Sequence, residues 1–228
     1  MTPSLPSWWE PLLTRVSTAT TDDFTRFHPP DNGGRDSAVL VLLGEQAPGD
    51  PDVLLLQRAA DMRNHAGQPA FPGGAADPGD ADATATALRE AGEEVGLDPS
   101  SVTVQAMLPR LWIPVSDFVV TPVLAWWHSP HPVAPLDPRE VDHVARVRVS
   151  HLVDPAHRVR VRHPSGWVGP AFRTDSMLIW GFTAGVLSRL LEMGGWAQAW
   201  DTAGPLVDLP GLPAAGPPMS TGGSDSAP

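Results

Sequence analysis

The sequence predicts an α+β fold, in which helices cover a mixed β-sheet in an α/β/α arrangement. Apolar runs typical of strands alternate with helical patterns over roughly 200 residues of the chain. Two helical patterns are clear, and two helices are too few to cover both faces of a parallel sheet through repeated strand–helix–strand units. The sheet is therefore expected to be mixed.

The first elements lie within a lead-in over residues 1–35 and the start of a domain over residues 36–202. Residues 7–17 predict a short helix, and the apolar runs 37–45 and 52–59 predict two strands joined by a turn. Residues 60–72 show no clean period and are expected to form an ordered loop. Gly73 and Gly74 are expected to form a tight turn after it.

A helix is predicted over residues 83–95, with Asp80 or Asp82 as its N-cap and Gly96 as its left-handed stop. At about 100° per residue, its side chains separate into two faces. The inward face is expected to hold Thr84, Leu88, Ala91 and Val95, and the opposite, exposed face Glu90, Glu93 and Glu94.

The second half predicts four further strands, one long helix and a tail. The strands are expected at 102–108, 118–127, 144–152 and 157–163. Apolar residues recur at helical spacing over 177–193. Residues 203–228 are rich in Pro, Gly and Ser and are predicted to be a disordered tail.

Composition excludes several kinds of chemistry. The chain has no cysteine, lysine or tyrosine, which removes thiolate metal sites, Schiff-base catalysis and phenolic acids or bases. The net charge of −11 argues against binding to nucleic acid or to anionic membranes. No apolar run approaches the roughly 20 residues of a membrane span, and the first residues lack the features of a signal peptide. We therefore expect a soluble, cytoplasmic protein with a small-molecule substrate, and the sequence leaves open whether it forms a homodimer.

Three carboxylates crowd the C-terminal end of the helix over 83–95. Glu90, Glu93 and Glu94 repel one another, and the negative end of a helix disfavours them. The alternative is that they are ordinary solvated acids. Their narrow face and the nearby Phe-Pro-Gly-Gly segment instead indicate a site for a hard divalent cation, Mg²⁺ or Mn²⁺. Such a cation is suited to phosphoryl chemistry.

The string from Arg89 to Leu97 resembles the core of the Nudix box and matches each of its specified positions. The resemblance implies a Nudix α/β/α sandwich with a mixed sheet, and hydrolysis of a nucleoside diphosphate linked to another group. It also implies Glu90 and Glu94 as the principal metal ligands, and Glu93 as a third ligand or as an aid in positioning water. Arg89 would pair with an acid of the box and hold its loop.

The loop of the box departs from the usual pattern. It is one residue longer between Gly74 and Arg89, and Asp80 stands where glutamate is usual. Asp77 likewise stands where many members have glutamate. The longer spacing puts a metal role for either aspartate in doubt.

The segment before the box resembles the signature of the coenzyme A pyrophosphatase branch, and the likeness extends over residues 36–200. Leu56 departs from it, because threonine is usual there. The residues in register are Arg58, Ala59, Arg63, Gly67, Phe71, Pro72, Gly73 and Gly74. The resemblance implies that coenzyme A or an acyl derivative is cleaved to 3′,5′-ADP and 4′-phosphopantetheine or its acyl form.

Within that signature, Arg58 and Arg63 are candidates for binding the 3′-phosphate, because a guanidinium fork suits a phosphate. Alternatively, they pair with nearby acids and brace the loop. The predicted substrate-binding set comprises Arg58, Arg63, Gly67, Phe71, Gly73 and Gly74, although Phe71 could instead belong to the core.

The predicted catalytic set comprises Glu90, Glu93, Arg89 and Glu140. Glu140 is the candidate catalytic base or extra ligand outside the box, and its alternative is a solvated turn residue. Two other functions stay open. One is hydrolysis of another substrate, such as NADH or an oxidised nucleoside triphosphate, and the other is non-catalytic binding of a metabolite.

Overall fold

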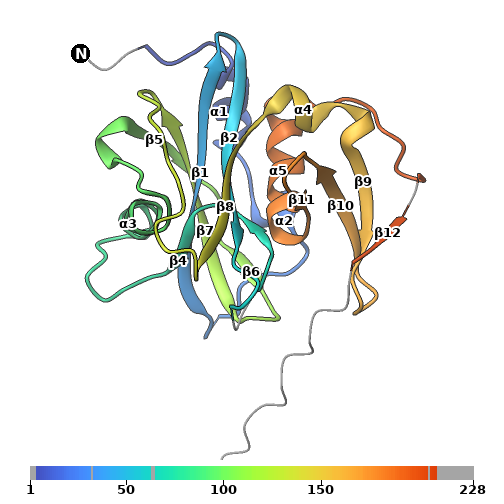
Figure 1. The fold of residues 1–228 in the computed structure, drawn as a ribbon, viewed down its shortest axis with the longest axis horizontal. Coiled ribbons are helices and arrows are strands. Elements are labelled where there is room, and N and C mark those ends of the chain that lie inside the picture. Colours follow the sequence, from blue (N-terminus) through green and yellow to red (C-terminus); the bar gives the residue numbers. More distant parts are fainter. Residues whose placement is uncertain (1–3, 32, 63–64, 205, 210–228) are drawn as a thin grey trace, which may run out of the picture.

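The computed structural model describes residues 4–31, 33–62, 65–204 and 206–209 (Figure 1). Its larger sheet has eight strands, and its smaller sheet has four. The strands of the larger sheet are β1 (Arg35–Ala47), β2 (Asp50–Arg58), β3 (Pro69–Ala70), β4 (Gly73–Ala75), β5 (Val102–Met107), β6 (Leu111–Ile113), β7 (Phe118–Trp127) and β8 (Val141–Arg148). Those of the smaller sheet are β9 (Arg158–Arg162), β10 (Val168–Arg173), β11 (Leu178–Ile179) and β12 (Leu206–Asp208).

The larger sheet is mixed, as predicted. Its main order is β3-β2-β1-β7-β5, with β8 also paired to β2. The central pair β1 and β7 is parallel, whereas β1 and β2 are antiparallel. The middle of β1 is buried on both faces, which explains its nearly continuous apolar sequence.

Helices cover the two faces of this sheet, and each face has its own core. The helices are α1 (Trp9–Val16), α2 (Thr21–Phe24), α3 (Ala83–Val95), α4 (Val149–Val153) and α5 (Gly181–Met193), with short 3₁₀ helices at Pro99–Ser101 and Pro155–His157. Helix α3 packs on one face and α5 on the other (Figure 1). No helix of the described residues is long and apolar enough to cross a membrane.

Helix α3 has the bounds that its sequence predicts. The carboxylate of Asp82 caps it by accepting a hydrogen bond from the backbone N–H of Ala85 at 2.8 Å. Gly96 ends it with φ of 72°. The predicted faces were partly wrong, because Glu94 is buried together with Ala91 and Val95.

Other predicted elements differ from those observed. Gly73 and Gly74 lie in strand β4, paired with β1, and not in a tight turn. Residues 149–153 form α4, where a strand was predicted to continue, and the start of the predicted helix over 177–193 is strand β11.

The predicted disordered tail is wrong for residues 206–208, which form β12 and pair with β9. Residues 205 and 210–228 of the predicted tail lie outside the described residues.

Candidate active site

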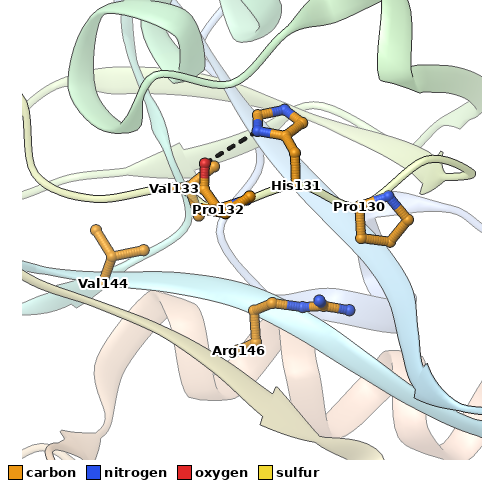
Figure 2. A pocket seen from close by; sticks show the side chains of 6 residues that line it. All are labelled: Pro130, His131, Pro132, Val133, Val144 and Arg146. Carbon is orange, nitrogen blue, oxygen red and sulfur yellow. Dashed lines mark hydrogen bonds between the residues drawn. The ribbon is translucent and has the colours of Figure 1, made fainter.

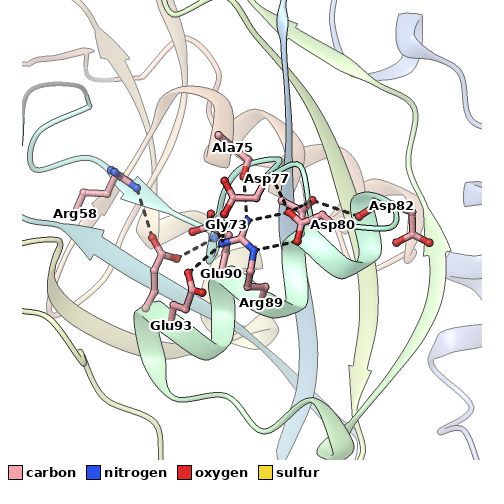
Figure 3. A network of polar contacts seen from close by, with 11 residues as sticks. Arg58, Gly73, Ala75, Asp77, Asp80, Asp82, Arg89, Glu90 and Glu93 are labelled. Carbon is pink, nitrogen blue, oxygen red and sulfur yellow. Dashed lines mark hydrogen bonds and ion pairs between the residues drawn. The ribbon is translucent and has the colours of Figure 1, made fainter.

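Arg89 lies at the centre of the polar network in Figure 3. Its Nε and Nη2 donate to the two carboxylate oxygens of Asp80, both at 3.0 Å. Its Nη1 donates to Glu90 and Glu93 at 3.0 Å, and Nη2 also donates to the carbonyl of Ala75 at 3.1 Å. Arg89 therefore ties the loop before α3 to the helix, as the resemblance implied.

Asp80 is the principal partner of Arg89. Hydrogen bonds from Arg89 hold the pKa of Asp80 well below its usual range. Asp80 also accepts hydrogen bonds from the backbone of Asp77 and the hydroxyl of Thr86, both at 2.9 Å. Asp80 thus stabilises the longer loop through its hydrogen bonds. A carboxylate that already accepts these bonds is poorly placed to bind a metal.

Glu94 is the most deeply buried of the three glutamates, at 6% exposure. One carboxylate oxygen accepts a hydrogen bond from the backbone N–H of Gly73 at 2.9 Å, and the other lies 3.6 Å from Nη1 of Arg58. Burial raises the pKa of Glu94 to about 7, against the effects of Gly73 and Arg58. The charges of Glu90 and Glu140 add to the rise.

Glu90 lies against the other glycine of β4. A Cβ atom at Gly74 would lie 2.5 Å from the carboxylate carbon and from one oxygen of Glu90. Burial raises the pKa of Glu90, although its hydrogen bond from Arg89 opposes the rise. The absence of a side chain at Gly74 therefore lets bare backbone approach the carboxylate of Glu90.

Glu93 differs from its two neighbours. Its side chain is 63% exposed and forms an ion pair with Arg89 at 3.0 Å. Over the described ranges, no three acidic or histidine side chains are grouped so that they could enclose a metal ion. The predicted three-glutamate cluster is therefore not assembled as a unit.

The remaining pair fits a divalent cation in the chemistry of its donors. Glu90 and Glu94 offer hard carboxylate oxygens, and burial disfavours their charged forms until a cation compensates them. Magnesium is commonly held by one or two protein carboxylates, with water and substrate phosphates as its other ligands. Glu90 and Glu94 supply two carboxylates of this kind.

The proline-rich segment 129–140 joins the end of α3 to Glu140, a connection that the sequence did not reveal. The backbone N–H groups of Ala134 and Leu136 donate to the carbonyls of Val95 and Glu94 at 3.2 and 3.0 Å. These bonds satisfy two carbonyls at the helix end. The segment leads to Glu140, whose side chain is exposed and whose charge contributes to the raised pKa of Glu94.

The other residues predicted to bind substrate lie in different surroundings. Phe71 is 2% exposed and packs in the core, which was the alternative to a role in substrate binding. Its side chain is therefore not available to a substrate. Gly67 has φ of 64°, and its carbonyl accepts a hydrogen bond from Gln57. Arg63 lies outside the described residues.

A separate hollow lies beside β8 (Figure 2). It has a volume of about 440 Å³ and is lined by Pro130, His131, Pro132, Val133, Val144 and Arg146. Both polar side chains in its lining have protein partners, since Arg146 pairs with buried Asp52 at 2.7 Å and His131 contacts the backbone N–H of Asp98 at 3.1 Å. None of the predicted site residues lines it.

Comparison with known proteins identifies the family. The model of the NUDIX domain matches residues 34–170. The chain belongs to the Nudix family. A relative from Citrobacter koseri, named "Uncharacterized Nudix hydrolase NudL", is 38% identical over 199 residues, which cover 78% of this chain and 97% of the relative. The protein of the same name from Escherichia coli K12 is 39% identical over 168 residues, covering 70% and 83% of the two chains.

Solved structures are similar at lower identity. A Nudix hydrolase from M. smegmatis, RenU, is 22% identical, with a TM-score of 0.49 over 72% of this chain and 88% of that one. The family match and the curated relatives make this chain a Nudix hydrolase, an enzyme that acts on phosphorus anhydrides. Nudix hydrolases generally use divalent metal ions.

Proposed function

We propose that this Nudix hydrolase cleaves the pyrophosphate of coenzyme A or of an acyl-coenzyme A. The products would be 3′,5′-ADP and 4′-phosphopantetheine or its acyl form. One observation supports this proposal most. Arg58 and Gly73, at the two ends of the segment that resembles the coenzyme A branch, both contact Glu94 of the Nudix box. The segment that resembles the coenzyme A branch and the Nudix box therefore meet at the carboxylate of Glu94.

In this proposal, Glu90 and Glu94 would hold Mg²⁺ or Mn²⁺, and the exposed Glu93 would help to position water. A metal held there would supply charge withdrawal from the phosphate and a lowered pKa for a water molecule. Arg89 keeps Glu90 and Glu93 in place through its hydrogen bonds. Glu140 would accept the proton of the attacking water, because its side chain is exposed and its backbone carbonyl is bonded to Ala59, the residue after Arg58, which pairs with Glu94.

The 3′-phosphate of coenzyme A needs a partner away from the metal. Arg58 pairs with Glu94 and therefore lies at the pyrophosphate end, in agreement with the alternative that it pairs with an acid. The proposed partner of the 3′-phosphate is therefore Arg63.

The proposal is tested by incubating purified protein with Mn²⁺ and coenzyme A and measuring 3′,5′-ADP by chromatography. We expect Glu90→Gln and Glu94→Gln each to lower kcat/KM by more than about 100-fold, because each removes a proposed metal ligand. Glu192→Gln is the matched control, since Glu192 lies on α5, on the other face of the sheet. Full turnover in both box variants would contradict the metal assignment.

The substrate is tested separately with a panel of coenzyme A, acetyl-coenzyme A, dephospho-coenzyme A, NADH and nucleoside triphosphates. Coenzyme A and its acetyl form should be hydrolysed with the highest kcat/KM, and dephospho-coenzyme A should show a raised KM. A preference for NADH or a triphosphate would instead indicate another Nudix substrate. An unchanged KM for dephospho-coenzyme A would contradict the role proposed for Arg63.

A further inference from the structure

Two arginines approach the box, and they differ in how far their hydrogen-bonding capacity is used. Arg89 makes five hydrogen bonds. Arg58, within the described part of the chain, makes no side-chain hydrogen bond, and its buried Nε has no partner. Its contact with Glu94 is an ion pair at 3.6 Å, longer than a hydrogen bond. A guanidinium with five N–H donors is thus held beside the site with its donors largely unused.

The backbone of Arg58 is fixed, which confines any movement to its side chain. Arg58 ends β2, and its N–H donates to the carbonyl of Gln68 at 3.0 Å. The next N–H, of Ala59, donates to the carbonyl of Glu140 at 2.9 Å. The side chain of Arg58 is 23% exposed, and rotation about its side-chain bonds moves no backbone atom of the sheet.

The position of the guanidinium bears directly on cation binding. One oxygen of Glu94 is occupied by the N–H of Gly73, and the other faces Arg58. A divalent cation bound to that second oxygen would lie close to a positive charge in a poorly solvated place, where like charges repel strongly. The guanidinium of Arg58 and the divalent cation therefore compete for Glu94, unless an anion binds the guanidinium instead.

We propose that Arg58 is an exchangeable counter-ion, which neutralises Glu94 in the free enzyme and transfers to the substrate pyrophosphate when a divalent cation binds Glu94. This inference rests on the proposed function, in which Glu94 is a metal ligand. The planar fork of arginine suits a phosphate better than a single carboxylate oxygen at 3.6 Å. Metal and pyrophosphate consequently promote each other's binding, and the coupling is reciprocal.

The test measures Mn²⁺ affinity by electron paramagnetic resonance, with and without methylenediphosphonate, at controlled free Mn²⁺. Without the diphosphonate, Arg58→Gln should bind Mn²⁺ about fivefold more tightly than the wild type or better, since coupling between sites is typically of this size. Adding the diphosphonate should raise the Mn²⁺ affinity of the wild type by a larger factor than that of Arg58→Gln. Equal or weaker Mn²⁺ binding by Arg58→Gln would overturn the exchange.

Further variants separate charge from folding. Arg162→Gln removes a positive charge from β9, in the smaller sheet, and should leave the Mn²⁺ affinity unchanged. Arg58→Lys keeps the positive charge, so its Mn²⁺ affinity should stay within about twofold of that of the wild type. A change of this size is too small to count as lost coupling. Arg58→Met replaces Arg58→Gln if that variant does not fold.

The two proposals fail in different ways. If the wild type bound no Mn²⁺ with or without the diphosphonate, the metal site and the exchange would both be rejected. If the wild type bound Mn²⁺ and hydrolysed coenzyme A, but Arg58→Gln bound Mn²⁺ no more tightly, the exchange alone would be rejected.

Discussion

At the scale of single residues, the structure leaves no room for a side chain at two adjacent positions. A Cβ at Gly73 would collide with the carbonyl of Ala38 on β1, and a Cβ at Gly74 would collide with the carboxylate of Glu90. The first collision would be with the backbone of β1, so a side chain at Gly73 would disturb the pairing of β4 with β1. The second is with the end of a flexible side chain that the proposed reaction uses. The two glycines therefore serve the fold and the site respectively.

Gly74→Ala should impair catalysis more than folding. The added methyl would displace the carboxylate of Glu90, which moves by rotation without unpacking the sheet. We expect kcat/KM for the pyrophosphate substrate to fall by at least about tenfold, since small displacements of catalytic groups are costly. The far-UV circular dichroism spectrum should be unchanged.

Gly79→Ala is the matched control, because Gly79 lies in the loop that follows β4 and its added methyl would meet no atom within 4 Å. Its activity should equal that of the wild type. A Gly74→Ala enzyme with full activity would show that Glu90 need not occupy its observed position.

At the scale of elements, α3 is a helix whose two ends are fixed by different means. Asp82 caps its start, while Gly96 and the segment 129–140 satisfy carbonyls at its end. Its last turn contains Gly92, at a position that the Nudix box leaves unspecified, and the structure gives no reason for glycine there. A Cβ there would lie 3.6 Å from the carbonyl oxygen of Leu97, an ordinary contact.

Gly92→Ala should therefore stabilise the protein. Alanine restricts the unfolded chain and favours the helix, so we expect the free energy of unfolding to rise by about 0.5–1 kcal/mol. Urea denaturation followed by circular dichroism measures this change, with kcat/KM expected to stay the same. A fall in stability would mean that the contact with Leu97 is tighter than it is in the structure.

At the scale of the whole molecule, burial of Glu94 makes stability depend on pH. Its pKa is about 7 in the folded protein, against an ordinary value of 4.5. Between these values the folded state retains a proton that the unfolded state has lost, so the free energy of unfolding falls as the pH rises. The contribution of Glu94 to the free energy of unfolding is fully present below pH 4.5 and is lost as the pH rises through 7.

Glu94→Gln should remove this dependence, because its amide oxygen can still accept from Gly73 and does not ionise. In metal-free buffer with EDTA, the wild type should lose about 3 kcal/mol more than Glu94→Gln between pH 4.5 and pH 8. Urea denaturation at the two pH values gives the difference, and Glu192→Gln should behave as the wild type. The same slope in Glu94→Gln would place the responsible group elsewhere.

Local signals in the sequence predicted much of the larger sheet and all of α3. Capping residues, glycine stops and apolar runs act over a few neighbouring residues, and the bounds of α3 follow from them. The contribution of Arg89 to the box was likewise available from the motif. These features do not depend on the packing of distant segments.

What the sequence could not predict depends on contacts between distant segments. The side chain of Glu94 contacts Gly73 of β4 and Arg58 of β2, which are remote from it in the chain. Strand β11 interrupts the predicted start of α5 because Leu178 and Ile179 pair with β10. Strand β12 lies in a stretch whose composition is typical of disorder, and it is a strand because β9 offers it a partner.

That last pairing has a consequence for how the protein behaves in a crowded solution. Strand β9 would otherwise form the rim of the smaller sheet, with a row of open amide and carbonyl groups. Residues 206–208 occupy this row, and Leu209 covers the apolar residues beneath it. The open edge of the sheet is thereby moved from the five residues of β9 to the three residues of β12, and this shorter edge offers fewer groups for strand-to-strand pairing between molecules.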